Sequence, residues 1–183
     1  MTSIAIGEAA PPFELPDTEG AAHALNGDGA ASAPATVVVF TCNHCPYALA
    51  WHDRLLAVAR DYADSGVRML LVNPNDAERY PRDSMEAMQA RVRADGGWPA
   101  PYLRDEDQSV ARAYGAKTTP DVFVVAPDGA IAYRGAPDAD HGDPGLDAAW
   151  LRAALDDLRA GRLEGAAVLV VDPERAGARA SLP

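Results

Sequence analysis

The sequence predicts an α/β fold in which helices cover both faces of a mixed central sheet. Two short apolar runs, residues 37–40 and 67–72, have the β-branched character of buried strands, and helical spacing follows each of them. Later in the chain, residues 122–125 and 130–133 flank Pro-Asp-Gly at 127–129, which is typical of a hairpin. Strand–helix alternation that ends in a hairpin and a closing helix favours a three-layer arrangement, because helices then cover both faces of one sheet.

Apolar spacing and capping residues predict four helices. Apolar side chains recur every three or four residues after Pro46, as an amphipathic helix requires. Asp83, with a glutamate three residues on, predicts the start of the second helix, and Gly115 the end of the third. Pro144 is expected in the first turn of the last helix, after Asp143. The predicted helices cover residues 46–64, 84–94, 108–114 and 143–160, with a short strand at 102–103.

The two ends of the chain carry weaker patterns. Residues 7–34 are rich in Gly, Pro and Ala and predict an extended entry with a polar turn at 17–20. Residues 168–171 are expected to form an edge strand. We expect a single domain over residues 1–183, with about 165–183 as a peripheral tail, since no linker or repeat divides the chain.

Composition and charge limit the function. The chain has 16 Lys and Arg against 27 Asp and Glu, a formal net charge of −11 that repels nucleic acid. Hydrophobic residues make up 48%, so a packed core is expected rather than disorder. No segment is long and apolar enough to span a membrane, and the start lacks the basic and apolar regions of a signal peptide. We therefore expect a cytoplasmic protein with neither membrane nor nucleic-acid partners.

The only two cysteines of the chain, Cys42 and Cys45, form a Cys-x-x-Cys pair. The pair follows a predicted strand and opens a predicted helix, and this order indicates a redox site. A disulfide that closes so short a loop constrains the unfolded chain little. Two cysteines do not complete a structural zinc site either, because such sites take four ligands.

The position of each cysteine predicts its role in thiol–disulfide exchange. Unpaired N–H groups and the macrodipole at a helix N-terminus favour thiolate over thiol, and only thiolate attacks a disulfide. Cys42, the more N-terminal sulfur, is predicted to be the accessible, acidic thiol that attacks. Cys45 then resolves the mixed disulfide. His44 lies between them, and as imidazolium it is predicted to tune the pair by favouring the Cys42 thiolate.

Further motifs accompany the Cys-Asn-His-Cys-Pro-Tyr sequence at 42–47. They are the segments 7–17, 73–76, 101–105, 114–116, 118–121 and 133–135, which together span most of the chain. With a strand before the cysteines and a Thr-Pro-Asp motif and hairpin after them, the chain resembles the thioredoxin superfamily. Its N-terminal segment and its cysteine motif are similar to those of the AhpC/TSA (redoxin) proteins, in particular a peroxiredoxin-like group.

The resemblance implies a thioredoxin fold with an N-terminal extension and an insertion before the strand that follows a cis-proline. In that fold Pro120 is cis and lies beside the cysteine pair, and Thr119 presents backbone groups to an extended substrate. Thr41, directly before the pair, is also expected to contact substrate. Two features depart from relatives. No third cysteine precedes the Thr-Pro-Asp motif, and Thr36 stands where thioredoxin has a buried Asp, so the proton acceptor for Cys45 is not identified.

We predict a thiol–disulfide oxidoreductase that needs no cofactor. Its expected partners are protein or small-molecule thiols and disulfides, with an unidentified electron donor. A thiol-dependent peroxidase is one alternative, since Cys45-Pro46 resembles the Cys-Pro of peroxiredoxins, although Cys42 stands where those proteins have Thr or Ser. A non-enzymatic Cu(I) or thiol-binding carrier is another, because soft thiolates suit Cu(I). The cysteine spacing and the histidine positions fit a carrier less well.

Other polar residues are given structural explanations. Asn43, Asn73 and Asn75 are weak candidates for substrate contact, and turn chemistry accounts for the last two. His52 is expected on the solvent-facing side of the first helix. The acidic residues within 138–143 predict a solvated loop capped by Asp143 rather than a metal site, because their spacing fits no calcium loop.

Overall fold

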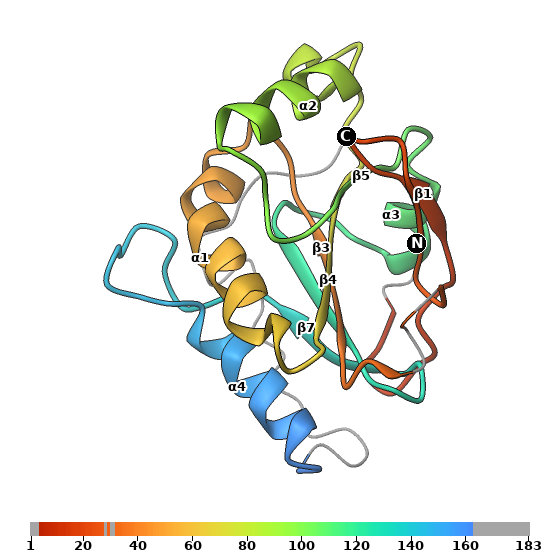
Figure 1. The fold of residues 1–183 in the computed structure, drawn as a ribbon, viewed down its shortest axis with the longest axis vertical. Helices are drawn as coiled ribbons and strands as arrows, with labels where there is room; N and C mark the ends of the chain where they lie inside the picture. The colour runs from red at the N-terminus through yellow and green to blue at the C-terminus, as the bar shows by residue number, and fades with distance from the viewer. Residues whose placement is uncertain (1–3, 28, 30–31, 163–183) are drawn as a thin grey trace.

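A five-stranded mixed sheet forms the centre of the computed structural model, which describes residues 4–27, 29 and 32–162 (Figure 1). The strand order is β5-β4-β3-β6-β7. Strands β3, β4 and β5 run parallel, whereas β6 is antiparallel to both β3 and β7. The strands are β3 (Thr36–Phe40), β4 (Arg68–Asn73), β5 (Tyr102–Arg104), β6 (Asp121–Val125) and β7 (Ile131–Gly135).

The apolar runs of the sequence become central strands because both faces of the sheet are covered. In β3, Val37 and Val39 enter one hydrophobic core, while Val38 and Phe40 enter a second core on the opposite face. Successive side chains of a strand point to opposite faces, so a strand buried on both sides reads as a continuous apolar run. All five β3 residues are accordingly buried.

Helices cover both faces, as predicted. Trp51, Met88 and Leu155, from three different helices, fill the first core, and Tyr114 from a fourth helix fills the second. Figure 1 shows α1 and α4 on the side of the sheet opposite to α3. The helices are α1 (Pro46–Ala63), α2 (Met85–Ala94), α3 (Ser109–Tyr114) and α4 (Ala149–Arg159), and a short 3₁₀ helix, η2 (Pro81–Asp83), precedes α2. Among the described residues, no helix is apolar over a stretch long enough to cross a membrane.

The N-terminal extension contains a small hairpin that the sequence did not predict. Strands β1 (Glu14–Pro16) and β2 (Ala22–Ala24) pair antiparallel around the predicted polar turn. Asp17 makes this turn, since its Oδ1 accepts hydrogen bonds from the N–H groups of Glu19 and Ala21. The extension also lies along the main sheet, with an isolated bridge from Asp17 to Leu103.

The predicted cap of α2 was wrong by one residue, and the error concerns a functional residue. The N-cap is Ser84, whose Oγ accepts a hydrogen bond from the N–H of Ala87. Asp83 ends η2 instead, and its carboxylate is fully buried against the cysteine loop. A serine cap satisfies the first turn of the helix as well as an aspartate does, so Asp83 is free for other contacts.

The predicted start of the last helix was also wrong, because α4 begins at Ala149 rather than near Asp143. Asp143 closes a turn by accepting from the N–H of Gly145. The loop before α4 is anchored by Asp138, which is buried and accepts hydrogen bonds from Trp51 and Arg54 and from the N–H of Ala148. The loop is therefore only partly solvated. The predicted edge strand at 168–171 and the tail at 165–183 lie outside the described residues.

Candidate redox site

The cysteine pair lies where β3 passes into α1. Cys42 follows the end of β3, Cys45 is the N-cap residue of α1, and Pro46 occupies the first turn. Proline suits this position because its missing N–H needs no partner there. The N–H of Cys45 points to Sγ of Cys42, at 3.3 Å. The two sulfurs are thus held together at the helix N-terminus, as the sequence predicted.

Both cysteines are buried, which contradicts the prediction that Cys42 is accessible. The exposed fraction is 0% for Cys42 and 1% for Cys45. Both are free thiols. A partner disulfide therefore reaches Cys42 only if neighbouring groups move.

The Thr119–Pro120 segment lies directly against the two sulfurs. Its peptide bond is cis, as the resemblance implied. Because β6 starts at Asp121 and pairs with Phe40 at the end of β3, the register brings Thr119 to the cysteine loop. Sγ of Cys42 lies 3.2 Å from Oγ1 of Thr119, and Sγ of Cys45 donates to the Thr119 carbonyl at 3.3 Å. Thr119 thus contacts both sulfurs.

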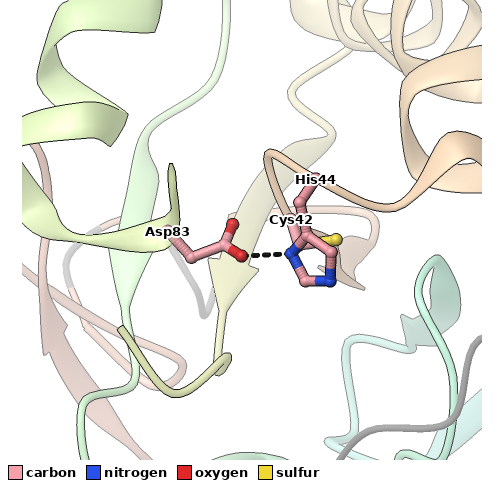
Figure 2. Close-up of side chains that lie close together, drawn as sticks. All are labelled: Cys42, His44 and Asp83. Carbon is pink, nitrogen blue, oxygen red and sulfur yellow. Dashed lines mark hydrogen bonds and ion pairs between the residues drawn. The ribbon is translucent and has the colours of Figure 1, made fainter. Parts of the chain in front are cut away.

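His44 and Asp83 lie close to Cys42 and complete the site (Figure 2). Nδ1 of His44 is hydrogen-bonded to Oδ2 of Asp83. Atoms of Cys42, His44 and Asp83 all lie within 4.8 Å of one another. The His44 ring also stacks on Tyr80, with ring centroids 4.1 Å apart and planes inclined by 7°. This packing and the Asp83 contact fix the orientation of the imidazole beside the Cys42 sulfur.

Asp83 is held by two further donors. Its Oδ1 accepts hydrogen bonds from the N–H of Asn43 at 2.6 Å and from Nδ2 of Asn73 at 3.0 Å. Both partners are uncharged, so His44 is the partner of Asp83 able to carry a positive charge. Sequence reasoning missed Asp83 because it considered this residue only as a helix cap. The chain offers no local signal for the contact, since Asp83 lies 39 positions after His44.

The three asparagine candidates form a buried network beneath the site. Asn43 accepts from Tyr102 and Arg91 through its Oδ1, at 3.0 Å each. Oδ1 of Asn73 accepts from the backbone N–H and the side-chain amide of Asn75, which is the turn chemistry that the sequence indicated. All three asparagines are buried. Their side-chain contacts hold the loop and Asp83 in place.

Two further residues are buried, and one of them, His52, was expected to face solvent. Thr41 is buried, and its N–H continues the sheet by donating to the carbonyl of Val72. His52 was predicted to face solvent, but it is 8% exposed and its ring packs 4.4 Å from that of Trp98. Desolvation lowers the pKa of His52 to about 4, and the charge of Arg91 acts in the same direction. His52 lies outside the cysteine cluster.

Contact between the two thiols separates their pKa values. The hydrogen bond between the thiols raises the pKa of Cys42, as does burial, and the same bond lowers the pKa of Cys45 to about 5. These opposite pKa shifts contradict the prediction that Cys42 is the more acidic thiol. Two hydrogen bonds around the pair favour the opposite assignment, whereas backbone contacts of Tyr47 and Ala48 also lower the pKa of Cys45. The Thr119 carbonyl only accepts, so it holds a proton on Cys45, whereas the N–H of Cys45 donates to Cys42. Because a carbonyl has no proton to donate, the direction of its hydrogen bond with Cys45 is fixed.

The sheet order, the position of the cysteine pair before α1 and the cis-proline segment before β6 define a thioredoxin-like fold. Comparison with known proteins then gives the family. The AhpC/TSA family model matches residues 6–134, and the chain belongs to this family.

Three solved structures illustrate the likeness. A hypothetical protein from Sinorhizobium meliloti 1021 is 38% identical, with 87% of each chain covered and a TM-score of 0.80. An uncharacterized conserved protein from Geobacillus kaustophilus is 40% identical, with 86% of this chain and 83% of that chain covered and a TM-score of 0.80. A putative thiol:disulfide interchange protein DsbE from Chlorobium tepidum is 19% identical, with coverage of 86% and 99% and a TM-score of 0.67, and shows the shared fold. No curated protein matches the chain.

Proposed function

We propose that this chain is a thiol–disulfide oxidoreductase in which Cys42 attacks and Cys45 resolves. The observation that carries the proposal is the contact of both sulfurs with Thr119 at the N-terminus of α1. In the reduced protein the Cys42 thiolate attacks one sulfur of a partner disulfide. The partner S–S bond breaks, a mixed disulfide forms, and the leaving sulfur takes a proton. Cys45 then attacks Sγ of Cys42, releasing the second partner thiol and leaving a Cys42–Cys45 disulfide.

The hydrogen bonds around the pair support this order. Cys42 receives the N–H of Cys45, and Oγ1 of Thr119 lies where its hydroxyl can donate to the same sulfur. Both contacts stabilise a thiolate. Cys45 donates to a carbonyl, so it is the sulfur that keeps its proton until the mixed disulfide forms.

In this proposal His44 supplies the positive charge beside the Cys42 thiolate, and Asp83 holds the imidazole ring in position. With Nδ1–H directed to Asp83, the imidazole remains beside Sγ of Cys42 and can carry the proton that Cys42 loses. Asp83 has no contact with the attacking sulfur in this role. It acts through His44, as an acidic residue that orients a histidine does in other nucleophilic sites.

Access to Cys42 requires a local opening. The half-buried ring of His44 lies beside a fully buried sulfur, and Tyr80 covers one face of that ring. We infer that movement of this stacked pair gives access to Cys42, since neither ring belongs to a strand of the sheet. Thr119 and Pro120 then form the other wall against which a partner segment lies.

A thiol peroxidase is the second candidate. The low pKa of Cys45 and the Cys45-Pro46 sequence at the start of α1 favour it, since a peroxidatic cysteine reacts as thiolate. In this case Cys45 is oxidised by peroxide to the sulfenic acid, and Cys42 condenses with it, releasing water and forming the disulfide.

One pair of variants separates the two candidates. Cys45→Ser and Cys42→Ser are reduced and then mixed either with oxidised glutathione or with hydrogen peroxide, in the presence of a metal chelator. If the chain is an oxidoreductase, Cys45→Ser accumulates a mixed disulfide between Cys42 and glutathione. Cys42→Ser then reacts with oxidised glutathione much more slowly. Rapid peroxide consumption by Cys42→Ser, with no glutathione adduct on Cys45→Ser, contradicts the oxidoreductase and supports the peroxidase.

A further inference from the structure

Three side chains with different metal-binding atoms converge at the site. Sγ of Cys42, a ring nitrogen of His44 and a carboxylate oxygen of Asp83 lie within 4.8 Å of one another (Figure 2). We propose that in the reduced protein these three side chains bind a zinc ion. The proposal goes beyond thiol–disulfide exchange, and binding itself does not depend on that activity.

The ligand set and the geometry suit zinc. Thiolate, imidazole and carboxylate are the side-chain ligands of this ion, with bond lengths of about 2.0–2.3 Å. Two ligands of a tetrahedral zinc are therefore about 3.3–3.8 Å apart. The three atoms already lie within 4.8 Å of one another, so changes of side-chain torsion that separate the hydrogen-bonded His44 and Asp83 atoms bring all three to ligand positions. The ion replaces the hydrogen bond between His44 and Asp83.

The charge of the buried site also favours a divalent cation. The Asp83 side chain is 0% exposed, and its other partners are the uncharged N–H of Asn43 and amide of Asn73. When Cys42 is a thiolate, the site holds two negative groups beside one imidazole. Arg91 does not compensate Asp83 directly, because it donates to the carbonyl of Cys42 and to Oδ1 of Asn43. Two buried anions beside a single imidazole are costly, and a dication neutralises both.

The surroundings orient the Asp83 ligand, and three protein ligands leave a fourth position on a tetrahedral zinc. Asn43 and Asn73 hold Oδ1 of Asp83, which directs Oδ2 to His44. Such outer contacts are what fix ligand orientation in metal sites. Cys45 lies outside the three-residue cluster, and its thiol faces the Thr119 carbonyl. Three protein ligands therefore leave the fourth position of zinc for water.

Zinc binding blocks the proposed exchange reaction. The Cys42 thiol releases its proton to solvent, and the sulfur forms a Zn–S bond with the electron pair that otherwise attacks a disulfide. No oxidation or reduction takes place. The bound ion thus protects the reduced thiol, and removal of the ion restores it.

The test measures metal binding by the full-length protein, reduced and freed of reductant under argon. Zn²⁺ is titrated in competition with a chromophoric chelator, and Co²⁺ serves as a second probe through its thiolate charge-transfer band. One ion per chain is expected. Cys42→Ser should abolish binding, His44→Gln and Asp83→Asn should each weaken it by about tenfold or more, and Cys45→Ser should retain it. His52→Gln is the matched control, because it removes a histidine of α1 outside the cluster, and it should bind as the wild type does.

Two results overturn the proposal. One is the absence of stoichiometric binding by the reduced wild-type protein. The other is equal loss in Cys42→Ser and Cys45→Ser with unchanged affinity in Asp83→Asn and His44→Gln, which indicates chelation by the dithiol alone. Circular dichroism establishes that each variant is folded. Because the His44 side chain is partly exposed and that of Asp83 is buried, His44→Gln is less disruptive to the fold than Asp83→Asn. Exchange activity is measured separately in the presence of chelator, so loss of one property does not imply loss of the other.

Discussion

Asp83 Oδ2 and His44 Nδ1 are hydrogen-bonded to each other, joining η2 to the loop between the two cysteines. The carboxylate is fully buried and the imidazole half-buried. The bond therefore holds the imidazole of His44 in a fixed orientation beside the sulfur of Cys42.

The first prediction is that Asp83→Asn slows attack by Cys42. A hydrogen bond to a charged group contributes about 1.5–3 kcal/mol, so its loss lowers kcat/KM for a small disulfide by roughly 10–100-fold. His44→Gln should have a similar effect, and the double variant should lose little more, because both residues act through one contact. Stopped-flow kinetics with chelator present gives the rates. Asp95→Asn, which changes a more exposed carboxylate, is the control. Additive losses in the double variant contradict the positioning role.

The second prediction concerns the order in which the two thiols react. Iodoacetamide labelling between pH 5 and 9, followed by mass spectrometry, should modify Cys42 first and below the usual thiol pKa of about 8.5, because the Thr119 carbonyl keeps the proton on Cys45. Both rates should be slow, since each sulfur is buried and is labelled only during local opening. Faster labelling of Cys45 at acidic pH agrees instead with its lowered pKa and favours the peroxidase alternative.

Local sequence patterns predicted the sheet and the cysteine pair, whereas long-range contacts decided the rest of the site. The β-branched run of β3 and the proline after Cys45 mark a strand–helix junction without reference to distant residues. The resemblance added Thr119 and Pro120. The burial of Cys42 and the contact of Asp83 with His44 depend on how η2 packs on the cysteine loop, and neither follows from a local pattern. The start of α4 also depends on distant contacts, because Asp138 joins Trp51 of α1 to the N–H of Ala148 just before α4.

That aspartate, Asp138, gives the third prediction. It is 1% exposed and accepts hydrogen bonds from Trp51, Arg54 and the N–H of Ala148. Asp138→Ala leaves the Arg54 guanidinium without its counter-ion in a largely buried position, which costs about 3–5 kcal/mol of unfolding free energy. Urea unfolding measures the change. Asp140→Ala, in the same loop but exposed, should alter stability by no more than about 0.5 kcal/mol. Similar values for the two variants contradict an anchoring role for Asp138.

The fourth prediction is that His52 makes the protein less stable in acid. Its pKa is about 4 in the folded protein, because desolvation and Arg91 outweigh the opposing charges of Asp53 and Asp95, and about 6.5 when unfolded. The unfolded chain therefore binds a proton below pH 6.5 that the folded protein does not bind until about pH 4. Stability from this residue is fully present above pH 6.5 and is lost as the pH falls to about 4.

The change is isolated by comparing wild type with His52→Phe, which keeps a ring against Trp98 but does not titrate. Carboxylates titrate in both proteins, so the difference between their unfolding free energies reports on residue 52. Between pH 7 and pH 4, the wild type should lose about 2 kcal/mol more than the variant, a figure reduced for the solvent that reaches part of the ring. Urea unfolding at half-unit pH steps follows the loss. Parallel curves for the two proteins mean that His52 has an ordinary pKa in the folded state and that its burial does not exclude the charged form.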